Sequence, residues 1–373
     1  MNQLPTHPTL EIGKLSAVFG DTTNAYKFYW LLSILDSLKE NNKPLIPKNE
    51  LALRMVASVW YPLDYYKLSF GKQDSFKGIA RRVSELLNID NSIHSENLFS
   101  QINTKLNLSD IKSINAMIPN TLLGYVPYRF VRPFFSHETA GLPDVKVNNA
   151  IKDTSNQFYT QQPERIIYRF VEDSIEINQV WFDYFQANQT ILRGFIYWHL
   201  LRFLQKHNDN VIGLTEKLEK PTQRNLTIAN DYWKGYLKDN SSLQCIYSNQ
   251  TISLQNLSLD HFIPWSYVAH DRLWNIIPTP KNVNSAKNDK LPDTALYFDK
   301  FSQLQYQSFI FYIQKEKFKL LEDYSLLFHE ELKPIAGFTY DVFKNTLQKQ
   351  IYPQLEIAKN MGFAPFIYSV KGT

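Results

Sequence analysis

Cysteine, glycine and net charge are all scarce in this sequence, and each scarcity excludes a class of protein. Of 373 residues only Cys245 is a cysteine, which excludes an intramolecular disulfide framework and predicts a reducing, cytoplasmic setting. Glycine occurs 12 times, whereas Phe occurs 25 times and Tyr 22 times, a balance that favours a packed helical protein. The formal net charge is only +4, so nucleic-acid binding would depend on local basic faces.

Long apolar runs are also missing. The longest run, GFIYWHLLRFL at 194–204, is too short for a membrane span and contains Arg202. The N-terminal residues MNQLPTHPTL lack a charged start followed by an apolar run, so no export signal is expected. We therefore expect no membrane partner.

Most of the chain has the apolar spacing of helices. A hairpin that turns at Glu172-Asp173 interrupts this pattern, and the polar, Pro-containing stretch EKLEKPTQRN predicts a domain entry near residue 225. The expected regions are a helical N-terminal region at 1–225, a central domain at 226–300 and a C-terminal helical region at 301–373. Helices are predicted over 24–40, 47–61, 75–87, 109–118, 179–206, 301–332 and 340–361.

One segment, LSLDHFIPWSYVAHDRLWNIIPTPKNVNSAKNDKLP at 257–292, gathers the residues that can carry chemistry. His261 precedes Asn275 by 14 residues, and Asn275 precedes Asn284 by 9. LSLDHFIP alternates apolar and polar positions like a short strand, NIIPT predicts a second strand, and 265–274 is polar enough for a loop.

A helix is predicted to follow the second strand. Thr279 would cap it and Pro280 would take its first position, where a missing N–H costs nothing. If the helix runs to about Lys290, then Lys281, Asn284, Lys287 and Asn288 lie along one face.

This strand–loop–strand–helix arrangement, with an Asp-His pair on the first strand, resembles the catalytic core of the HNH nucleases. It is similar to the HNH domain of the Cas9 effectors, which also has Asn rather than His as the last ligand. The resemblance covers about 50 residues. It implies an α+β protein, predominantly helical, with an embedded ββα-metal HNH nuclease module.

The resemblance implies a role for each polar residue of the segment. His261 would be the general base, and Asp260 and Asn284 would hold Mg²⁺ or Mn²⁺. Asn275 would bond the loop backbone and orient His261. Neighbouring strand residues normally point to opposite faces, so Asp260 and His261 can act on one phosphate only if the strand distorts there. We therefore predict a distortion of the strand at these two residues. The candidates for phosphate contacts are Lys281, Lys287, Lys290 and Arg272, and His270 is expected at the surface.

The segment departs from the family pattern in its cysteines. Many HNH proteins hold a structural zinc with two CxxC pairs, but Cys245 has Ser248 at its partner position, and no other cysteine exists. No structural zinc is therefore expected. The hairpin would instead be held by packing of the apolar and aromatic residues Ile246, Tyr247, Leu257, Leu259, Ile263 and Trp274.

Basic and aromatic residues cluster outside the segment, in YRFVRPFF at 128–135, at Arg81-Arg82 and in KEKFK at 315–319. Such clusters are typical of a surface that binds nucleic acid. They are also typical of the edge of an aromatic core with Arg side chains reaching solvent, and this second interpretation is favoured for each cluster alone.

The expected function is a metal-dependent endonuclease that hydrolyses DNA to leave 5′-phosphate and 3′-hydroxyl ends. Restriction or anti-phage defence is the setting that such proteins often serve. Two alternatives stay open: a nuclease-silent or partner-gated DNA-binding module, and an RNase or toxin-type nuclease. DNA is the expected partner, an activating signal or partner protein would act through the N-terminal region, and a homo-oligomer is left open.

Overall fold

The computed structural model describes residues 4–71, 75–87, 89, 95–105, 122–219 and 225–369. It has an α+β fold that is mostly helical, as the sequence predicts, with small sheets. The chain forms two compact units. Unit 1 comprises Met1–Asp209 and Lys217–Lys220, and unit 2 comprises Asn210–Glu216 and Pro221–Thr373.

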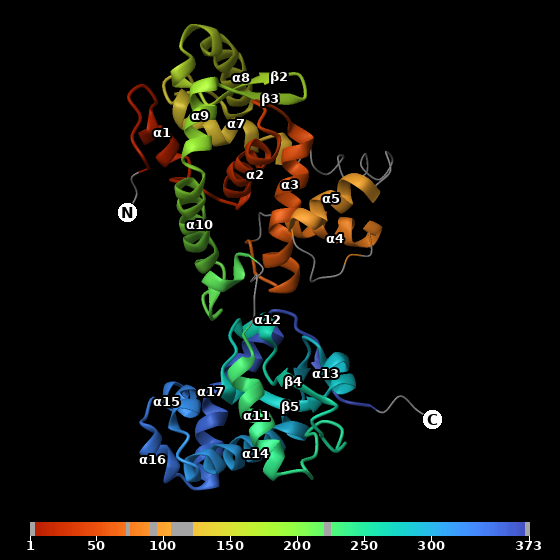
Figure 1. The fold of residues 1–373 in the computed structure, drawn as a ribbon. Coiled ribbons are helices and arrows are strands. Elements are labelled where there is room, and N and C mark those ends of the chain that lie inside the picture. The colour runs from red at the N-terminus through yellow and green to blue at the C-terminus, as the bar shows by residue number, and fades with distance from the viewer. Residues whose placement is uncertain are drawn as a thin grey trace. The chain divides into compact units, whose positions relative to one another are not determined.

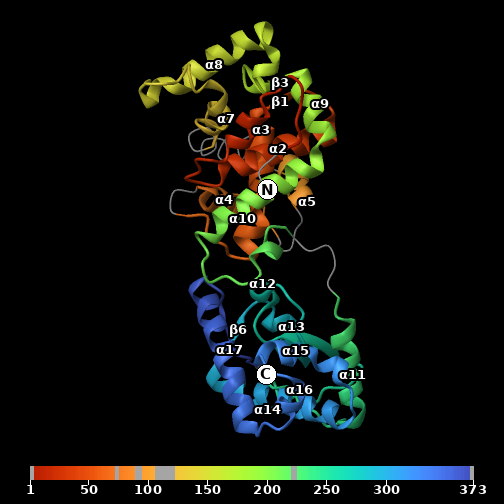
Figure 2. The same cartoon turned by 90° about the vertical axis from the view of Figure 1, so that its left-hand side faces the viewer.

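Unit 1 is built around two long helices. In Figure 2, α2 and α3 lie in its middle and α8 lies at its edge. Helix α2 packs against α3, α7, α9 and α10, and its buried face is mostly aromatic and aliphatic. The helices of unit 1 are α1 Ile12–Ala17, α2 Tyr26–Asn41, α3 Lys48–Trp60, α4 Phe76–Leu87, α5 Ser95–Lys105, α7 Val126–Val131, α8 Asp144–Gln161, α9 Gln179–Ala187 and α10 Gln189–Gln205.

The predicted helices over 24–40, 47–61 and 75–87 are confirmed as α2, α3 and α4. Pro62 does not stop α3 abruptly, because a π-helical turn at Tyr61–Tyr65 continues it with the proline in its first turn. The single helix predicted over 179–206 is wrong, since Asn188 separates α9 from α10. The helix predicted over 109–118 lies outside the described residues.

A small antiparallel sheet covers one end of unit 1. Its strands are β1 Leu45–Pro47, β2 Tyr168–Val171 and β3 Ser174–Ile177, in the order β1-β3-β2. The hairpin predicted at Glu172-Asp173 is confirmed, with Glu172 in the left-handed region at φ 46°.

Unit 2 contains a two-stranded hairpin, β4 and β5, followed directly by helix α13 (Figure 1). The connection between the strands is not a polar loop throughout, because it begins with a short helix whose residues are all buried. The elements of unit 2 are α11 Thr227–Asp239, β4 Leu257–His261, α12 Trp265–Val268, β5 Ile276–Pro280, α13 Lys281–Lys287, β6 Leu291–Pro292, α14 Thr294–Gln314, α15 Glu322–Phe328, α16 Leu332–Ala336, α17 Tyr340–Asn360 and β7 Pro365–Phe366.

The hairpin and the C-terminal helices share one core. Buried residues from α11, β5, α14, α15 and α17 belong to the same cluster, and Leu257 and Leu259 of β4 pack against it. Gln305 of α14 donates to the carbonyls of Leu273 and Ile276 at 3.3 and 3.0 Å and accepts from the Tyr324 hydroxyl at 2.6 Å. Residues on both sides of position 300 therefore share one core, and the expected domain boundaries near 225 and at 300 stay predictions.

The C-terminal part differs from its predicted helices in detail. The first helix begins before 301, at Thr294, and the stretch up to 332 is broken into α14, a 3-10 turn and α15. The helix predicted over 340–361 is confirmed as α17. A parallel pair, β6 with β7, was not predicted, since each strand has two residues. Within the described part of the chain, no helix has the length and apolar character that crossing a membrane requires.

Candidate active site

The hairpin positions the Asp-His pair. β4 pairs antiparallel with β5 in continuous register, with Asp260 opposite Ile277 and His261 opposite Ile276. The predicted distortion of the strand is therefore wrong. The two side chains have different partners, Tyr247 and Lys287 for Asp260 and Asp271 for His261.

Asp260 is held by two donors in the interior of unit 2. Its carboxylate accepts from the Tyr247 hydroxyl at 2.8 Å and from the Lys287 ammonium at 3.1 Å. The residue is 2% exposed. Burial raises the pKa of Asp260 against the opposing pull of the Lys287 cation, and burial likewise lowers the pKa of Lys287. This carboxylate is thus fixed in place by a buried hydrogen-bonded pair.

Lys287, a candidate for phosphate contacts in the sequence, lies in the interior of unit 2. Its side chain is fully buried, and its ammonium also donates to the backbone carbonyl of His261 at 2.6 Å. It therefore presents no exposed charge to a phosphate. It links the end of α13 to both residues of the Asp-His pair.

Helix α13 is shorter than predicted. Its N-cap is Pro280, and Thr279 is buried within β5. Because Pro280 has extended dihedral angles, β5 runs directly into the helix. The helix ends at Lys287, since Asn288 adopts φ 48°, so Asn288 and Lys290 do not continue its face.

His261 has a carboxylate partner. Its Nε2 lies 2.8 Å from Oδ1 of Asp271, which belongs to the connection between the strands. The His261 side chain is 8% exposed and that of Asp271 is 19% exposed. His270 is half-buried rather than at the surface, edge-on to Trp274, and burial lowers its pKa to about 4.

Asn275 bonds the loop backbone, as expected from the sequence. Its Oδ1 accepts from the amide of Ile263 at 2.8 Å, and its Nδ2 donates to the carbonyl of the same residue at 2.8 Å. Asn275 is fully buried. The pair of bonds fixes the chain two residues after His261, while an effect on the imidazole itself stays a prediction.

The amide of Asn284 has a defined direction. Its Nδ2 donates to Oγ of Ser258 at 2.7 Å and to the carbonyl of Leu259 at 3.0 Å. Because a backbone carbonyl can only accept, the atom that faces it must be the NH₂ group. The carbonyl oxygen Oδ1 is therefore the atom that Asn284 offers to a ligand, directly beside the strand of Asp260.

The remaining basic candidates surround the hairpin. Lys281 is exposed at the start of α13. Lys290 donates to the carbonyl of Ala286 at 3.1 Å, and Arg272 forms an ion pair with Asp323 at 2.6 Å. Contacts of these three residues with phosphates stay predictions, and Arg272 would have to exchange Asp323 for such a contact.

Apolar packing supports the hairpin, as predicted. Cys245 is a free, buried thiol within the core of unit 2. Ile246, Tyr247, Ile263 and Trp274 belong to that core, and Leu257 and Leu259 pack against it.

The oxygen atoms of Asp260 and Asn284 fit a hard divalent cation. An ionised carboxylate offers about four lone-pair positions. Tyr247 and Lys287 use two of these on Asp260, so positions remain for an ion. Among the described residues no three His, Cys, Asp or Glu side chains gather as metal ligands. An ion here would therefore need the amide oxygen and water to complete its coordination.

Two residues of the site were missed in the sequence. Asp271 follows His261 by ten positions inside the connection, and no spacing rule links the two residues before that connection folds back. Tyr247 was assigned to packing alone, yet its hydroxyl holds Asp260. An aromatic hydroxyl just before a predicted catalytic strand was the available signal, and it is a weak one.

The comparison with protein families agrees with this geometry. The family model described as HNH endonuclease matches residues 245–293. No curated protein matches the chain. No solved structure matches it either. The matched residues contain the hairpin, the Asp-His pair, both Asn residues and all of α13, and this segment of the chain is an HNH endonuclease domain.

Proposed function

We propose that this chain is a divalent-metal-dependent endonuclease that hydrolyses DNA phosphodiester bonds and leaves 5′-phosphate and 3′-hydroxyl ends. The observation that carries the proposal is the pair of His261 with Asp271, one residue along β4 from the buried Asp260 carboxylate. The family match over 245–293 supports the nuclease class.

His261 is suited to act as general base. The Asp271 carboxylate can only accept, so a neutral His261 carries its proton on Nε2. The lone pair on Nδ1 is then left to take a proton from water. A carboxylate that fixes the tautomer and orientation of an imidazole serves the same purpose in other hydrolytic sites.

Asp260 and Asn284 would hold the ion, Mg²⁺ or Mn²⁺. A bound divalent ion neutralises charge on the phosphate and on the departing oxygen. Tyr247 and Lys287 keep the Asp260 carboxylate at one position on the hairpin, and Ser258 and Leu259 keep the Asn284 amide at another. These contacts preorganise the ligand oxygens before an ion arrives.

DNA as the substrate and restriction or anti-phage defence as the setting depend on the family resemblance. Exposed Lys281 and half-buried Lys290 provide cations beside the hairpin for backbone phosphates. A small net charge of +4 means that these local cations, and not a field of the whole protein, would attract nucleic acid.

The test is a cleavage assay on supercoiled, linear and single-stranded DNA. We expect cutting with Mg²⁺ or Mn²⁺, no cutting with EDTA, and loss of cutting in His261→Ala with DNA binding intact. His137→Ala, which removes an exposed histidine from unit 1, is the matched control and should cut like the wild type. Cutting by His261→Ala at the wild-type rate would remove the proposal, and cleavage of RNA alone would replace it with the RNase alternative.

A partner-gated or nuclease-silent DNA-binding module is the second candidate. The observation that favours it is the burial of the proposed metal ligand: Asp260 pairs with Lys287, and their side chains are 2% and 0% exposed. The wild-type protein would then retard DNA in a gel without cutting it, whatever divalent metal is supplied.

A further inference from the structure

Unit 1 contains a cavity of about 730 Å³. Its lining comes from two stretches of chain, 17–27 and 125–142, which include the start of α2, helix α7 and the 3-10 turn Arg132–Phe135. The volume falls within the range of about 300 to 1,000 Å³ that is usual for small-molecule sites. No residue of the HNH endonuclease domain takes part in it.

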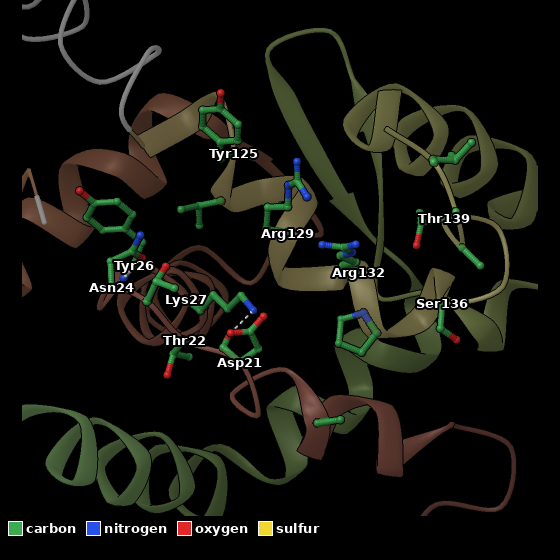
Figure 3. A pocket seen from close by; sticks show the side chains of 17 residues that line it. Asp21, Thr22, Asn24, Tyr26, Lys27, Tyr125, Arg129, Arg132, Ser136 and Thr139 are labelled. Carbon is green, nitrogen blue, oxygen red and sulfur yellow. Dashed lines mark hydrogen bonds between the residues drawn. The ribbon is translucent and has the colours of Figure 1, made fainter. Parts of the chain in front are cut away.

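Cations dominate the charged lining of this cavity. Of its four charged residues one is an acid, Asp21, and three are the cations Lys27, Arg129 and Arg132. Figure 3 shows the three cationic side chains in the middle of the lining, with Tyr26 and Tyr125 on one side and Ser136 and Thr139 on the other.

The positive charge of the cavity is only partly neutralised. Lys27 donates to the backbone carbonyl of Asp21 at 2.8 Å. Its pKa is lowered chiefly by burial, against the pull of Asp21, and the nearby charges of Arg132 and Arg129 lower it further. Arg129 pairs at 2.9 Å with Asp144, which is 73% exposed and lies outside the lining.

Arg132 differs from the other two cations. No hydrogen bond or ion pair joins its guanidinium to any residue in the described part of the chain, and the residue is exposed at the cavity. The guanidinium has five N–H donors in a planar fork that matches phosphate oxygens. All of these donors are therefore available to a ligand.

We propose that this cavity binds a small phosphorylated ligand, a nucleoside polyphosphate, through Lys27, Arg129 and Arg132. Three convergent cations match the charge of two or more phosphate groups, and Thr22 and Ser136 add hydroxyl groups to the same lining. The Tyr125 ring is 54% exposed at the edge of the cavity, with the Arg129 guanidinium over it at 5.9 Å from the ring centroid, so a planar base could contact the ring beside this cation. The site is separate from the nuclease proposal and does not depend on it.

A nucleic-acid strand is the competing occupant. Single-strand binding proteins track the backbone with a basic groove and stack successive bases on several rings. Here the cations meet within one cavity, which suits a compact anion.

The experiment measures binding by the full chain, without added metal, using inorganic pyrophosphate and ATP as probes. Both probes should raise the Tm of the wild-type protein. In calorimetric titration, Arg132→Glu should weaken the Kd for ATP by at least about tenfold, which is the scale of one lost charge-assisted contact. Arg81→Glu is the matched control, because Arg81 is 82% exposed in the same unit, outside the cavity, and it should bind like the wild type.

Three results would overturn the proposal. The first is that neither probe raises the Tm, and the second is that Arg132→Glu binds ATP as tightly as the wild type. The third is that single-stranded DNA, and neither probe, binds in a manner that depends on Arg132. If Arg132→Glu does not fold, as judged by circular dichroism, Arg132→Gln replaces it with the same expectations. Because the readout is binding, absence of nuclease activity would not affect the outcome.

Discussion

At the scale of single residues, Asp271 is the side chain on which the proposed chemistry of His261 depends. We expect Asp271→Asn to lower kcat for DNA cleavage by about 10- to 100-fold, the usual cost of losing a partner that orients a functional group. The variant keeps the size of the side chain and removes the anion that fixes the Nε2 proton. The Kd for DNA should stay unchanged.

The control for this prediction is Asp289→Asn, which alters a half-buried carboxylate just after α13. It should retain wild-type kcat. If Asp271→Asn weakens DNA binding and leaves kcat intact, Asp271 serves substrate binding rather than the orientation of His261.

His270 makes the stability of the protein depend on pH. Its pKa falls from 6.5 to about 4 on folding, because burial disfavours the charged ring and Arg272 adds to this effect. Between these values the unfolded chain binds a proton that the folded chain does not. Stability should therefore fall as pH falls from about 6.5 towards 4, by about 2 kcal/mol between pH 7 and pH 5.

Urea unfolding at pH 7 and pH 5 measures this effect. His270→Phe keeps a ring beside Trp274 and removes the titration, so it should lose about 2 kcal/mol less than the wild type over this range. Equal losses in the two proteins would mean that His270 is readily protonated in the folded state.

At the scale of elements, the hairpin and α13 are joined by one buried ion pair. Lys287→Met removes the cation and leaves the Asp260 carboxylate buried beside Tyr247 alone. We expect a loss of about 3 to 5 kcal/mol in the free energy of unfolding, the cost of stranding one partner of a buried pair. Lys281→Met, at the exposed start of the same helix, should change it by less than about 0.5 kcal/mol.

Chemical denaturation followed by tryptophan fluorescence gives both free energies. A loss in Lys287→Met no larger than that in Lys281→Met would show that the pair contributes little, for instance because Asp260 is protonated. Repeating the comparison at higher pH would separate these two explanations, since an ionised Asp260 should be harmed more by the loss of Lys287.

The elements of the site were predictable where they depend on residues close together in the sequence. Alternating apolar positions and Pro264 indicated β4, and the spacing of His261, Asn275 and Asn284 indicated the strand–loop–strand–helix order. Asp271 and the burial of Lys287 were not predictable. Both depend on how the connection and α13 fold back against β4, and such contacts leave no periodic signal in the chain.

At the scale of the whole molecule, the hairpin cannot be separated from the helices that follow it. We expect a fragment of residues 210–373 to fold cooperatively, because it contains all of unit 2 and its core. A fragment ending at residue 300 lacks most of α14 and all of α15 and α17, so its hairpin should remain unprotected. Hydrogen exchange of the β4 and β5 amides in the two fragments is the measurement.

Protected β4 and β5 amides in the shorter fragment would contradict this prediction and support the expected boundary at residue 300. There is a physical reason why the sequence did not predict the shared core. Apolar spacing shows which face of a helix is buried but does not name its partner, and Gln305, the residue that joins α14 to β5, is polar.

Later segments of the chain contact the hairpin region, through the pairing of β6 with β7 and through the bonds of Gln305. These contacts can form only after those segments have been translated. The hairpin emerges from the ribosome well before the helices that complete its core and the strand at Pro365–Phe366. A nascent chain therefore contains the Asp-His pair before the helices that pack against the hairpin have been synthesised. The core of the HNH domain can be completed only after the chain has been synthesised to Phe366.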